Sequence, residues 1–410
     1  MKLEINPQRL LAELRKLATF GAYRTGVHRP TFSPQDMAAR RWIMGRMTAA
    51  GLDPQMDGIG NILGTASGQR RRLLVGSHSD SQNHAGWLDG AMGVVYALEI
   101  ARAVAESGRS DIAVEPVDWA DEEAHFASFL GSRSAIGEVS EEEIDAARCA
   151  TTGKPLRQAL MDAGLAGRER LRIEPGRYLG YLEAHIEQGD YLDAHGLALG
   201  VVTTIVGIWQ YRLTFRGERN HAGTTRMAVR KDAGAALVAL IHRIEEHFRA
   251  LAGERTVWTV GSIRLEPGQV SIIPDLAEMM LQLRDADPEV LRRMDAALRD
   301  LVEETNAAGP CSADLELVSR SAPHAMSTGF KQALESEAEE VAPGRAIQLP
   351  SGAGHDAQIL AQVMPAGMLF VPSIGGVSHH WDENTRDEDL VLGCRALAGA
   401  CATLLTKAAP

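Results

Sequence analysis

The sequence predicts an α/β protein of two domains, one inserted into the other. Three observations lead to this prediction. Short apolar runs alternate with helical patterns, a middle segment follows a different order of strands and helices, and the first pattern resumes after it. Short buried strands that alternate with helices are typical of layered α/β domains. The length of 410 residues also fits two or three domains rather than one.

Four apolar runs of the first pattern end abruptly in acidic or histidine residues. The runs lie at residues 73–75, 112–119, 178–182 and 368–371, and a helical pattern covers residues 90–107. In α/β sheets, functional sites gather just beyond the carboxyl ends of the strands. The polar clusters fall at such places in all four runs, which predicts a site there.

The middle of the chain has the order β-α-β-β-α-β. Strand patterns lie at residues 209–216, 256–265, 277–284 and 315–319, and helical patterns lie at 232–251 and from Asp287 to about Asn306. This order is the signature of a ferredoxin-like split sandwich. We therefore predict a domain at 209–322, inserted into an α/β domain formed by 1–208 and 323–410.

Composition and charge exclude several classes of function. The chain is 45% hydrophobic and 23% charged, which is normal for a globular protein with a sizeable core. Its net charge of −12 argues against a nucleic-acid partner, because binding phosphates needs a basic face. We find no secretory signal and no uninterrupted apolar run that is long enough to span a bilayer.

The cysteines indicate a reducing compartment. Cys149, Cys311, Cys394 and Cys401 form no CxxC pair and no framework typical of disulfides. We interpret them as buried, inert thiols. Together with the absence of a signal or membrane segment, this predicts a cytoplasmic protein.

Histidines and acidic residues carry the candidate chemistry. In chain order they are His78, Asp80, Asp89, Glu122, Glu123, His185 and His379. Imidazoles and carboxylates without thiolates suit zinc, manganese or cobalt in a hydrolytic site. Two such metals that share one carboxylate lower the pKa of a bridging water and produce a nucleophile at neutral pH. A carboxylate that binds no metal would then carry the proton of the water to the leaving nitrogen.

Each of these residues alone is a weak signal. A lone histidine is more often a surface or hydrogen-bonded core residue than a ligand, and an Asp-Gly pair is usually a turn. The prediction depends on several clusters that each follow an apolar run. From the residues alone, either Glu122 or Glu123 is the one that faces a metal.

Motifs from about residue 70 to 385 resemble one family of amidohydrolases. They are Gly76-Ser77-His78-Ser79-Asp80, Asp89-Gly90, Asp121-Glu122-Glu123, Gly131-Ser132-Arg133, and the segments 183–189, 221–225, 351–357, 370–373 and 378–379. In this order they resemble the N-carbamoyl-L-amino-acid hydrolase, allantoate amidohydrolase and β-ureidopropionase family. That family belongs to the wider superfamily of di-zinc aminoacylases and carboxypeptidases. The resemblance implies hydrolysis of a C–N bond other than a peptide bond, in a small carboxylated substrate.

The resemblance also implies a set of metal ligands. His78 and His185 would bind one ion, Glu123 and His379 would bind a second, and Asp89 would bridge the two. The expected cofactor is a pair of zinc or manganese ions, with cobalt and nickel as alternatives, since the same ligand types accept all four.

Other catalytic roles follow from the same resemblance. Asp80 would orient His78, as a carboxylate beside a metal-binding imidazole usually does. Glu122 would be the general base and later the acid. The inserted domain would close over the substrate and build a homodimer, in which His221 of one subunit would stabilise the oxyanion in the other.

The resemblance implies that several residues contact the substrate. The expected contacts are Gln188, Ser271, Arg284, Gly352, Ala353, Gly354 and His355. Arginine suits the carboxylate of the substrate because its guanidinium pairs with one in bidentate fashion. The alternative for Arg284 is a surface arginine at a strand end, and the alternative for His355 is a structural histidine.

The chain departs from the family pattern near the expected substrate. Ser271 stands in place of an asparagine, Gln282 in place of an acid, and Arg226 in place of a proline. Aromatic and histidine rings also gather in the motif regions: Trp209, His84, Trp87, His125, Phe126 and Trp381. These differences predict a bulkier or aromatic amide, with ordinary packing of the rings as the alternative. We interpret His28 as a surface or helix histidine.

Three hypotheses about function follow. The first is a metal-dependent amidohydrolase of N-carbamoyl or N-acyl amino acids. The second is a dipeptidase or aminoacylase for an aromatic or bulky amide, distinguished by the product that it releases. The third is a metal-free binding scaffold. A scaffold is expected to have lost Glu122 or a ligand, and all of them are present.

Overall fold

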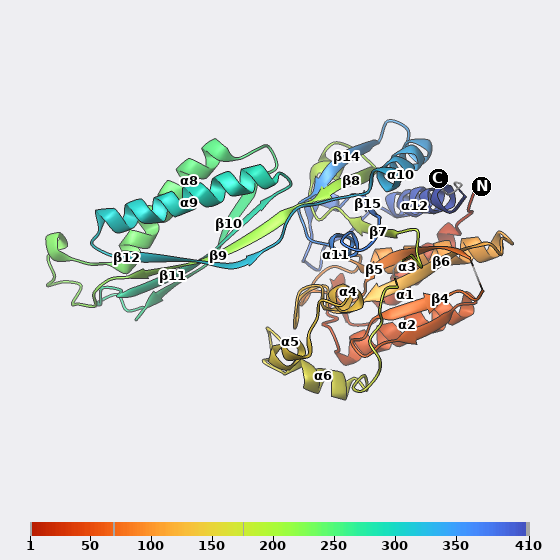
Figure 1. The fold of residues 1–410 in the computed structure, drawn as a ribbon, viewed down its shortest axis with the longest axis horizontal. Coiled ribbons are helices and arrows are strands. Elements are labelled where there is room, and N and C mark those ends of the chain that lie inside the picture. The colour runs from red at the N-terminus through yellow and green to blue at the C-terminus, as the bar shows by residue number, and fades with distance from the viewer. Residues whose placement is uncertain (1, 69, 175, 407–410) are drawn as a thin grey trace. The chain divides into compact units, whose positions relative to one another are not determined.

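The structure is a computed structural model that describes residues 2–68, 70–174 and 176–406. The chain divides into two compact units (Figure 1). Unit 1 comprises Met1–Thr203, Met326–Leu349 and Ala353–Pro410, and unit 2 comprises Thr204–Ala325 with Pro350–Gly352. The chain therefore leaves unit 1 to form unit 2 and then returns to complete unit 1.

A nine-stranded sheet forms the centre of unit 1. Its strands are β3 (Asp53–Met56), β4 (Ile62–Thr65), β5 (Arg71–His78), β6 (Ile112–Trp119), β7 (Tyr181–Ile186), β8 (Leu199–Ile205), β13 (His324–Ala325), β14 (Ala346–Ser351) and β15 (Ala366–Val371). The strand order is β13-β8-β15-β7-β5-β6-β4-β3, and β14 pairs with β8. Strands β15, β7, β5 and β6 run parallel, whereas β8, β4 and β3 pair antiparallel to their neighbours.

The parallel strands are buried on both faces. Every residue of β6, β7 and β15 is buried. Helices cover both faces of parallel sheets, so such strands are continuous apolar runs rather than alternating ones. This explains why the runs predicted near residues 73, 112 and 368 coincide with strands. The run predicted at 178–182 was placed too early, because β7 continues through the polar residues Glu183 and His185.

Helices pack on this sheet and flank it. They are α1 (Pro7–Ala18), α2 (Pro34–Ala49), α3 (Ala91–Glu106), α4 (Leu130–Ile136), α5 (Glu141–Ala146), α6 (Leu156–Asp162), α7 (Tyr191–Ala194), α10 (Thr328–Val341), α11 (Asp356–Leu360) and α12 (Asp387–Thr406). A short hairpin of β1 (Ala22–Tyr23) and β2 (Gly26–Val27) follows α1, and the 3-10 helix η2 (Ile374–Gly376) follows β15. Apolar residues of α1, α3, α10 and α12 share one core with the sheet.

Helix α12 is long and apolar enough to cross a membrane by length and composition, although Arg395 interrupts its apolar residues. Its apolar residues, among them Leu390, Leu397 and Leu405, are buried in the core that it shares with the sheet. Burial inside the fold accounts for the composition of this helix, because a core helix is apolar on most of its faces.

Unit 2 is built on an antiparallel sheet of four strands. Its elements are β9 (Gly207–Arg216), η1 (Met227–Val229), α8 (Ala233–Leu251), β10 (Val257–Glu266), β11 (Leu276–Asp285), α9 (Pro288–Ala308) and β12 (Ser312–Arg320). The strand order is β10-β11-β9-β12. Burial alternates along β9 and β11, since one face of each strand packs on the core with α8 and α9. The protein as a whole therefore has the mixed α/β fold that the sequence predicts.

The cysteines differ in part from the prediction. All four thiols are free, and Cys311, Cys394 and Cys401 are buried. Cys149 is only half-buried, so the prediction of a buried thiol is wrong at this position. It lies in the loop between α5 and α6.

Candidate metal centre

The candidate ligands lie at the carboxyl ends of the parallel strands and at the start of α3. His78 is the last residue of β5, His185 is the next-to-last residue of β7, and Asp89 precedes α3. Glu123 follows the end of β6, and His379 follows β15 and η2. Gly90 permits this arrangement, because a Cβ at its positive φ would lie 2.3 Å from Nε2 of His78.

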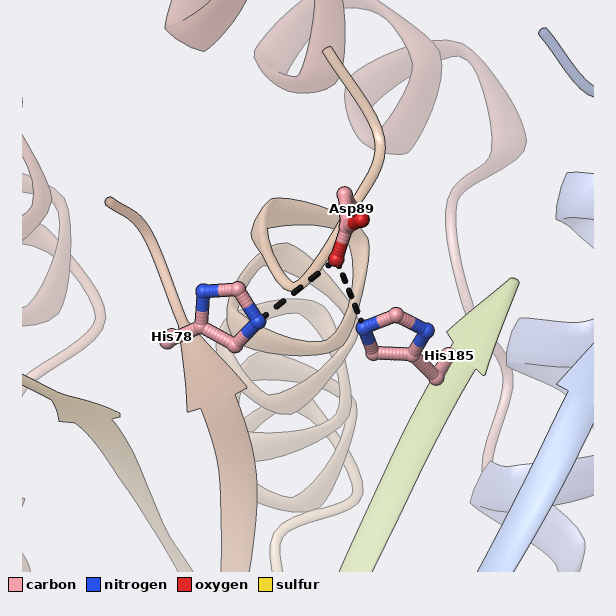
Figure 2. Close-up of side chains that lie close together, drawn as sticks. All are labelled: His78, Asp89 and His185. Carbon is pink, nitrogen blue, oxygen red and sulfur yellow. Dashed lines mark ion pairs between the residues drawn. The ribbon is translucent and has the colours of Figure 1, made fainter. Parts of the chain in front are cut away.

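Two groups of ligands share Asp89 (Figure 2 shows the first). In the first group, Oδ1 of Asp89 lies 3.6 Å from Nε2 of His78 and 3.0 Å from Nε2 of His185. In the second, Oδ2 of Asp89 lies 3.4 Å from Nε2 of His379, which is 3.8 Å from Oε2 of Glu123. The ligand atoms of each group lie within 4.8 Å of one another. Asp89 thus presents a different oxygen to each group, as a bridging carboxylate must.

The buried histidines fit a divalent cation. Nδ1 of His78 lies 3.0 Å from the backbone oxygen of Asp80, and Nδ1 of His185 lies 2.8 Å from that of Ile186. A proton on each Nδ1 leaves the lone pair of Nε2 for a metal. Nε2 of His78 is buried and has no hydrogen-bond partner among the described residues. This orphaned acceptor and the set of imidazoles and carboxylates match zinc or manganese.

The charges of the first group are strongly coupled. Burial alone would favour neutral groups, but the neighbouring imidazoles outweigh it and lower the pKa of Asp89 well below its usual value. Burial likewise opposes a charge on His185, and Asp89 with Glu183 overcomes it, raising its pKa to about 9. Without a metal, a proton therefore occupies His185 at neutral pH. A metal would compete with that proton for Nε2.

Glu122 belongs to neither group, yet it lies beside the first. Its Oε2 is 3.6 Å from Nε2 of His78. Burial raises its pKa well above the usual value, and the charges of Glu123, Asp356 and Asp89 add to the shift. Burial and Asp89 also raise the pKa of Glu123 to about 8. A concentration of buried acids without matching cations is the environment that a bound divalent ion would neutralise.

Asp80 lies beside His78, but its carboxylate does not make the expected hydrogen bond. Its Oδ1 is 3.7 Å from Nδ1 of His78, whose proton points to the backbone oxygen of Asp80 instead. The carboxylate faces Arg40 at 3.7 Å and accepts a hydrogen bond of 2.9 Å from Thr31. The backbone therefore orients the ring of His78, and the carboxylate supports the loop that carries it.

A buried arginine that the sequence analysis did not identify supports this side of the site. Arg40 of α2 is fully buried and contacts three carboxylates, Asp36 at 3.0 Å, Asp118 at 3.3 Å and Asp80 at 3.7 Å. It also donates hydrogen bonds to the backbone oxygen of Trp119 at the end of β6. No spacing in the sequence links α2 to β5 and β6, so only the folded chain reveals this contact.

Two further residues near the ligands were missed or were assigned a different contact. Buried Glu383 accepts hydrogen bonds from the backbone N–H groups of Leu88 and Asp89, at 3.2 and 3.1 Å. Gln188 was expected to contact the substrate, and its side-chain amide lies 3.0 Å from Oδ2 of Asp89. It also lies 3.2 Å from Nε2 of His379. Gln188 therefore borders the second ligand group.

The expected substrate residues lie in both units. In unit 1, the buried ring of His355 packs on His185 at 4.6 Å between centroids, and Ala353 and Gly354 precede it. In unit 2, Arg284 donates to the backbone oxygen of Gly352 at 2.9 Å and to the side-chain oxygen of Gln282.

His221 and Ser271 also lie together in unit 2. The backbone N–H of Ala222 donates to the carbonyl of Ser271 at 2.9 Å, and His221 pairs with Ile272. Both His221 and Ser271 are exposed. Nδ1 of His221 accepts hydrogen bonds from the backbone N–H groups of Gly223 and Thr224. Nε2 of the ring is therefore available to bind another partner.

The rings singled out in the sequence do not form one group. Phe126 packs on Phe32, buried His125 contacts the backbone of Ser81, and Trp209 lies buried in the core of unit 2. These three rings therefore have ordinary packing contacts, the alternative to a role in binding an aromatic substrate. His84 and Trp381 instead pack against Tyr23 in unit 1.

Comparison with known proteins identifies the family. Residues 74–403 match Peptidase family M20/M25/M40. The chain is 33% identical over 402 residues to an N-carbamoyl-L-amino-acid amidohydrolase of Paenarthrobacter aurescens, covering 94% of this chain and 95% of that protein. It is 31% identical over 393 residues to an allantoate amidohydrolase of Escherichia coli (strain K12), covering 93% of this chain and 94% of that protein.

A solved structure supports the same assignment. The crystal structure of an amidase of the hydantoinase/carbamoylase family from Burkholderia phymatum superposes with a TM-score of 0.90 at 47% identity, covering 99% of both chains. These relatives confirm the predicted resemblance. The M20 family is metal-dependent, in agreement with the two ligand groups. The chain therefore belongs to Peptidase family M20/M25/M40, among its carbamoylase-like amidohydrolases.

Proposed function

We propose that this chain is a metal-dependent amidohydrolase that cleaves a non-peptide C–N bond in an N-carbamoyl or N-acyl amino acid. The observation that carries the proposal is the pair of ligand groups that share Asp89, with Glu122 left over beside His78. The names of the relatives, which include carbamoyl-amino-acid and allantoate amidohydrolases, support an amide or ureido bond as the target.

The metal site would hold two ions. His78 and His185 would bind one, Glu123 and His379 the other, and Asp89 would bridge them through its two oxygens. Zinc or manganese suits these ligands, with cobalt and nickel as alternatives. When bound, such ions supply Lewis acidity that polarises a carbonyl oxygen and lowers the pKa of water.

Glu122 would move the proton. Its carboxylate lies close to the ligands and binds neither group, so it is available to accept a proton from the attacking water. Its position beside the ligands also allows it to pass that proton to the leaving nitrogen as a general acid. Asp80 would support the loop of His78 through its contacts with Arg40 and Thr31.

The carboxylate of the substrate would be held by Arg284 and its neighbours. Arg284 contacts the neutral amide of Gln282, and no acid among the described residues forms an ion pair with it. A guanidinium without an acidic partner keeps its charge available for a substrate carboxylate. Gln188, Ser271, Gly352, Ala353, Gly354 and His355 would complete this set of contacts.

The inserted domain, residues 209–322 within 1–208 and 323–410, would act as a ferredoxin-like lid and a dimerisation domain. The β-α-β-β-α-β order of unit 2 and its strand order β10-β11-β9-β12 support the ferredoxin-like assignment. In the homodimer, His221 would reach the site of the partner subunit, for which its exposed position is suitable. We place the enzyme in the cytoplasm.

The test is ammonia release by manganese- or zinc-loaded protein from a panel of N-carbamoyl, N-acyl and dipeptide substrates, aromatic ones included. Metal-dependent ammonia from carbamoyl compounds, lost on chelation, is the expected result. Cleavage of acyl or aromatic amides without ammonia would favour a dipeptidase or aminoacylase instead. No hydrolysis of any substrate in the panel, together with an absence of tightly bound metal, would favour a binding scaffold.

A further inference from the structure

Three loops of unit 1 converge next to the candidate metal centre. They are the β1–β2 hairpin, residues 82–87 and residues 379–383. Val27 bridges Ala85, and the hydroxyl of Thr25 at the hairpin tip donates to the backbone oxygen of Trp381 at 2.6 Å. Two of the three loops also carry metal-site residues, since Gln82 donates to Glu123 and His379 is a candidate ligand.

Aromatic side chains from these loops form a cluster that we name the ring platform, made of Tyr23, His84 and Trp381. Tyr23 lies 4.2 Å from His84 and 5.9 Å from Trp381 between ring centroids. His28 stacks on His84 at 4.4 Å and is half-buried. The platform therefore joins segments that are far apart in the sequence.

Arg24 lies on this platform. Its guanidinium carbon is 4.2 Å from the ring centroid of Trp381 and 5.5 Å from that of Tyr23. Stacking on rings holds the plane of a guanidinium while leaving its N–H edges available. Arg24 is exposed, and it makes no hydrogen bond or ion pair with any other described side chain. The result is an oriented cation whose donors have no partner in the described chain.

The backbone at this place is strained, which supports a functional role. Arg24, His84 and His379 are not glycines, and all three have left-handed φ angles of 51°, 55° and 52°. Such conformations cost free energy and persist where the surrounding structure requires them, often at ligand sites. Each of the three converging loops contributes one such residue.

Nearby acids do not neutralise Arg24. Asp382 belongs to the same loop as Trp381. Its carboxylate accepts a hydrogen bond from Thr25 at 2.8 Å and lies 3.7 Å from Nδ1 of His380.

The platform lies close to the candidate ligand His379 in the chain. Trp381 follows His379 by two residues, so their Cα atoms lie no more than about 7.6 Å apart. The loop that carries the candidate ligand His379 therefore also carries Trp381, the ring on which Arg24 stacks.

We propose that Arg24, oriented by the ring platform, binds a second carboxylate on the side chain of the substrate. The preferred substrates would then be dicarboxylic, such as N-carbamoyl or N-acyl derivatives of aspartate and glutamate. The proposal rests on the function proposed above and adds the substrate class. It assigns the rings to the positioning of an arginine rather than to the binding of an aromatic substrate.

The test compares charged and neutral isosteres. For manganese-loaded protein we expect kcat/KM to be higher on N-carbamoyl-aspartate than on N-carbamoyl-asparagine, and likewise for the glutamate and glutamine pair. Arg24→Met should reduce this charged-to-neutral ratio by about 10- to 100-fold, the range for a hydrogen bond to a charged group. Arg24→Lys should reduce it less, because the charge remains without the planar fork. Arg41→Met removes an exposed arginine of α2 and should leave the ratio unchanged.

A binding measurement separates this proposal from the function on which it rests. In a Glu122→Gln background, calorimetry with N-carbamoyl-aspartate should show a Kd that rises by the same factor when Arg24 is replaced by Met. If Arg24→Met raised the Kd equally for the aspartate and asparagine compounds, Arg24 would not bind the second carboxylate. The proposed amidohydrolase activity would be unaffected by this result. A preference for aromatic over dicarboxylic substrates that survives Arg24→Met would overturn it as well. Failure of every N-carbamoyl compound to bind or react would remove the proposed function, and this proposal with it.

Discussion

The two ligand groups around Asp89 differ in exposure. The side chains of His78 and His185 are 1% exposed, whereas that of His379 is 51% exposed. Both histidines of the first group are held by backbone carbonyl groups, and His379 has a left-handed backbone and contacts the amide of Gln188. One shared carboxylate therefore joins a buried half-site to one that is open at His379. We therefore expect that the buried half would hold an ion firmly and that the half with His379 would exchange its ion with solvent.

The support behind the two groups differs as well. Behind the first lies a fully buried network in which Arg40 faces Asp36, Asp80 and Asp118. Beside the second lie the amides of Gln82 and Gln188, which donate to Glu123 and Asp89. Charged networks in the interior fix geometry strongly, while neutral, half-buried amides move with less cost.

The largest effect is expected from Glu122→Gln, which tests the residue outside both groups. The substitution removes proton transfer while leaving every ligand in place, so kcat should fall by roughly 10²- to 10⁴-fold. Metal content measured by atomic emission should match the unaltered protein. Glu142→Gln, in an exposed acid of α5, is the matched control. Near-normal turnover in Glu122→Gln would show that another group moves the proton.

Arg40→Met tests the support of the buried group. It leaves Asp36, Asp80 and Asp118 without their shared cation, so the free energy of unfolding should fall by about 3–5 kcal/mol. Denaturant titration followed by circular dichroism measures this loss, and Arg41→Met on the same helix is the control. A loss of less than about 1 kcal/mol would mean that the carboxylates are neutral or find other partners.

Replacing one histidine from each group tests the difference directly. His379→Ala should lose about half of the bound metal during dialysis and keep the ion of the buried group, because that group retains its ligands. His185→Ala should lower metal content further, because it removes a preorganised ligand and leaves Asp89 with fewer partners. Equal metal loss in the two variants would contradict the distinction between a firm and an exchangeable half-site.

The smallest effect is expected in the pH dependence of metal-free protein. Burial raises the pKa of Asp118 to about 7 although Arg40 lies 3.3 Å away. Between about pH 4 and 7 the folded state therefore keeps a proton that the unfolded chain releases, and stability from this group falls as the pH rises, by no more than about 1.4 kcal/mol per pH unit. Asp118→Asn should flatten this slope in thermal unfolding. An unchanged slope would mean that Asp118 is ionised across the range.

The sequence by itself was sufficient for the features that depend on short-range pattern. Continuous apolar runs identified β6 and β15, because strands covered on both faces need apolar side chains throughout. The polar residues after such runs pointed to His78, Glu123 and His379, since parallel strands bring their carboxyl ends to one edge of the sheet. Motif resemblance added the prediction of which residues would share an ion, which periodicity does not reveal.

Only the tertiary structure decided which distant side chains meet. The contact of Arg40 with Asp80, the amide of Gln188 on Asp89, and the stacking of Arg24 on Trp381 join segments that no local pattern connects. It also separated the rings that pack in the core, such as Trp209, from those that meet at the platform. The physical reason is that the type of a residue predicts whether its side chain prefers to be buried or exposed. Which other side chain it contacts depends on how the whole chain folds.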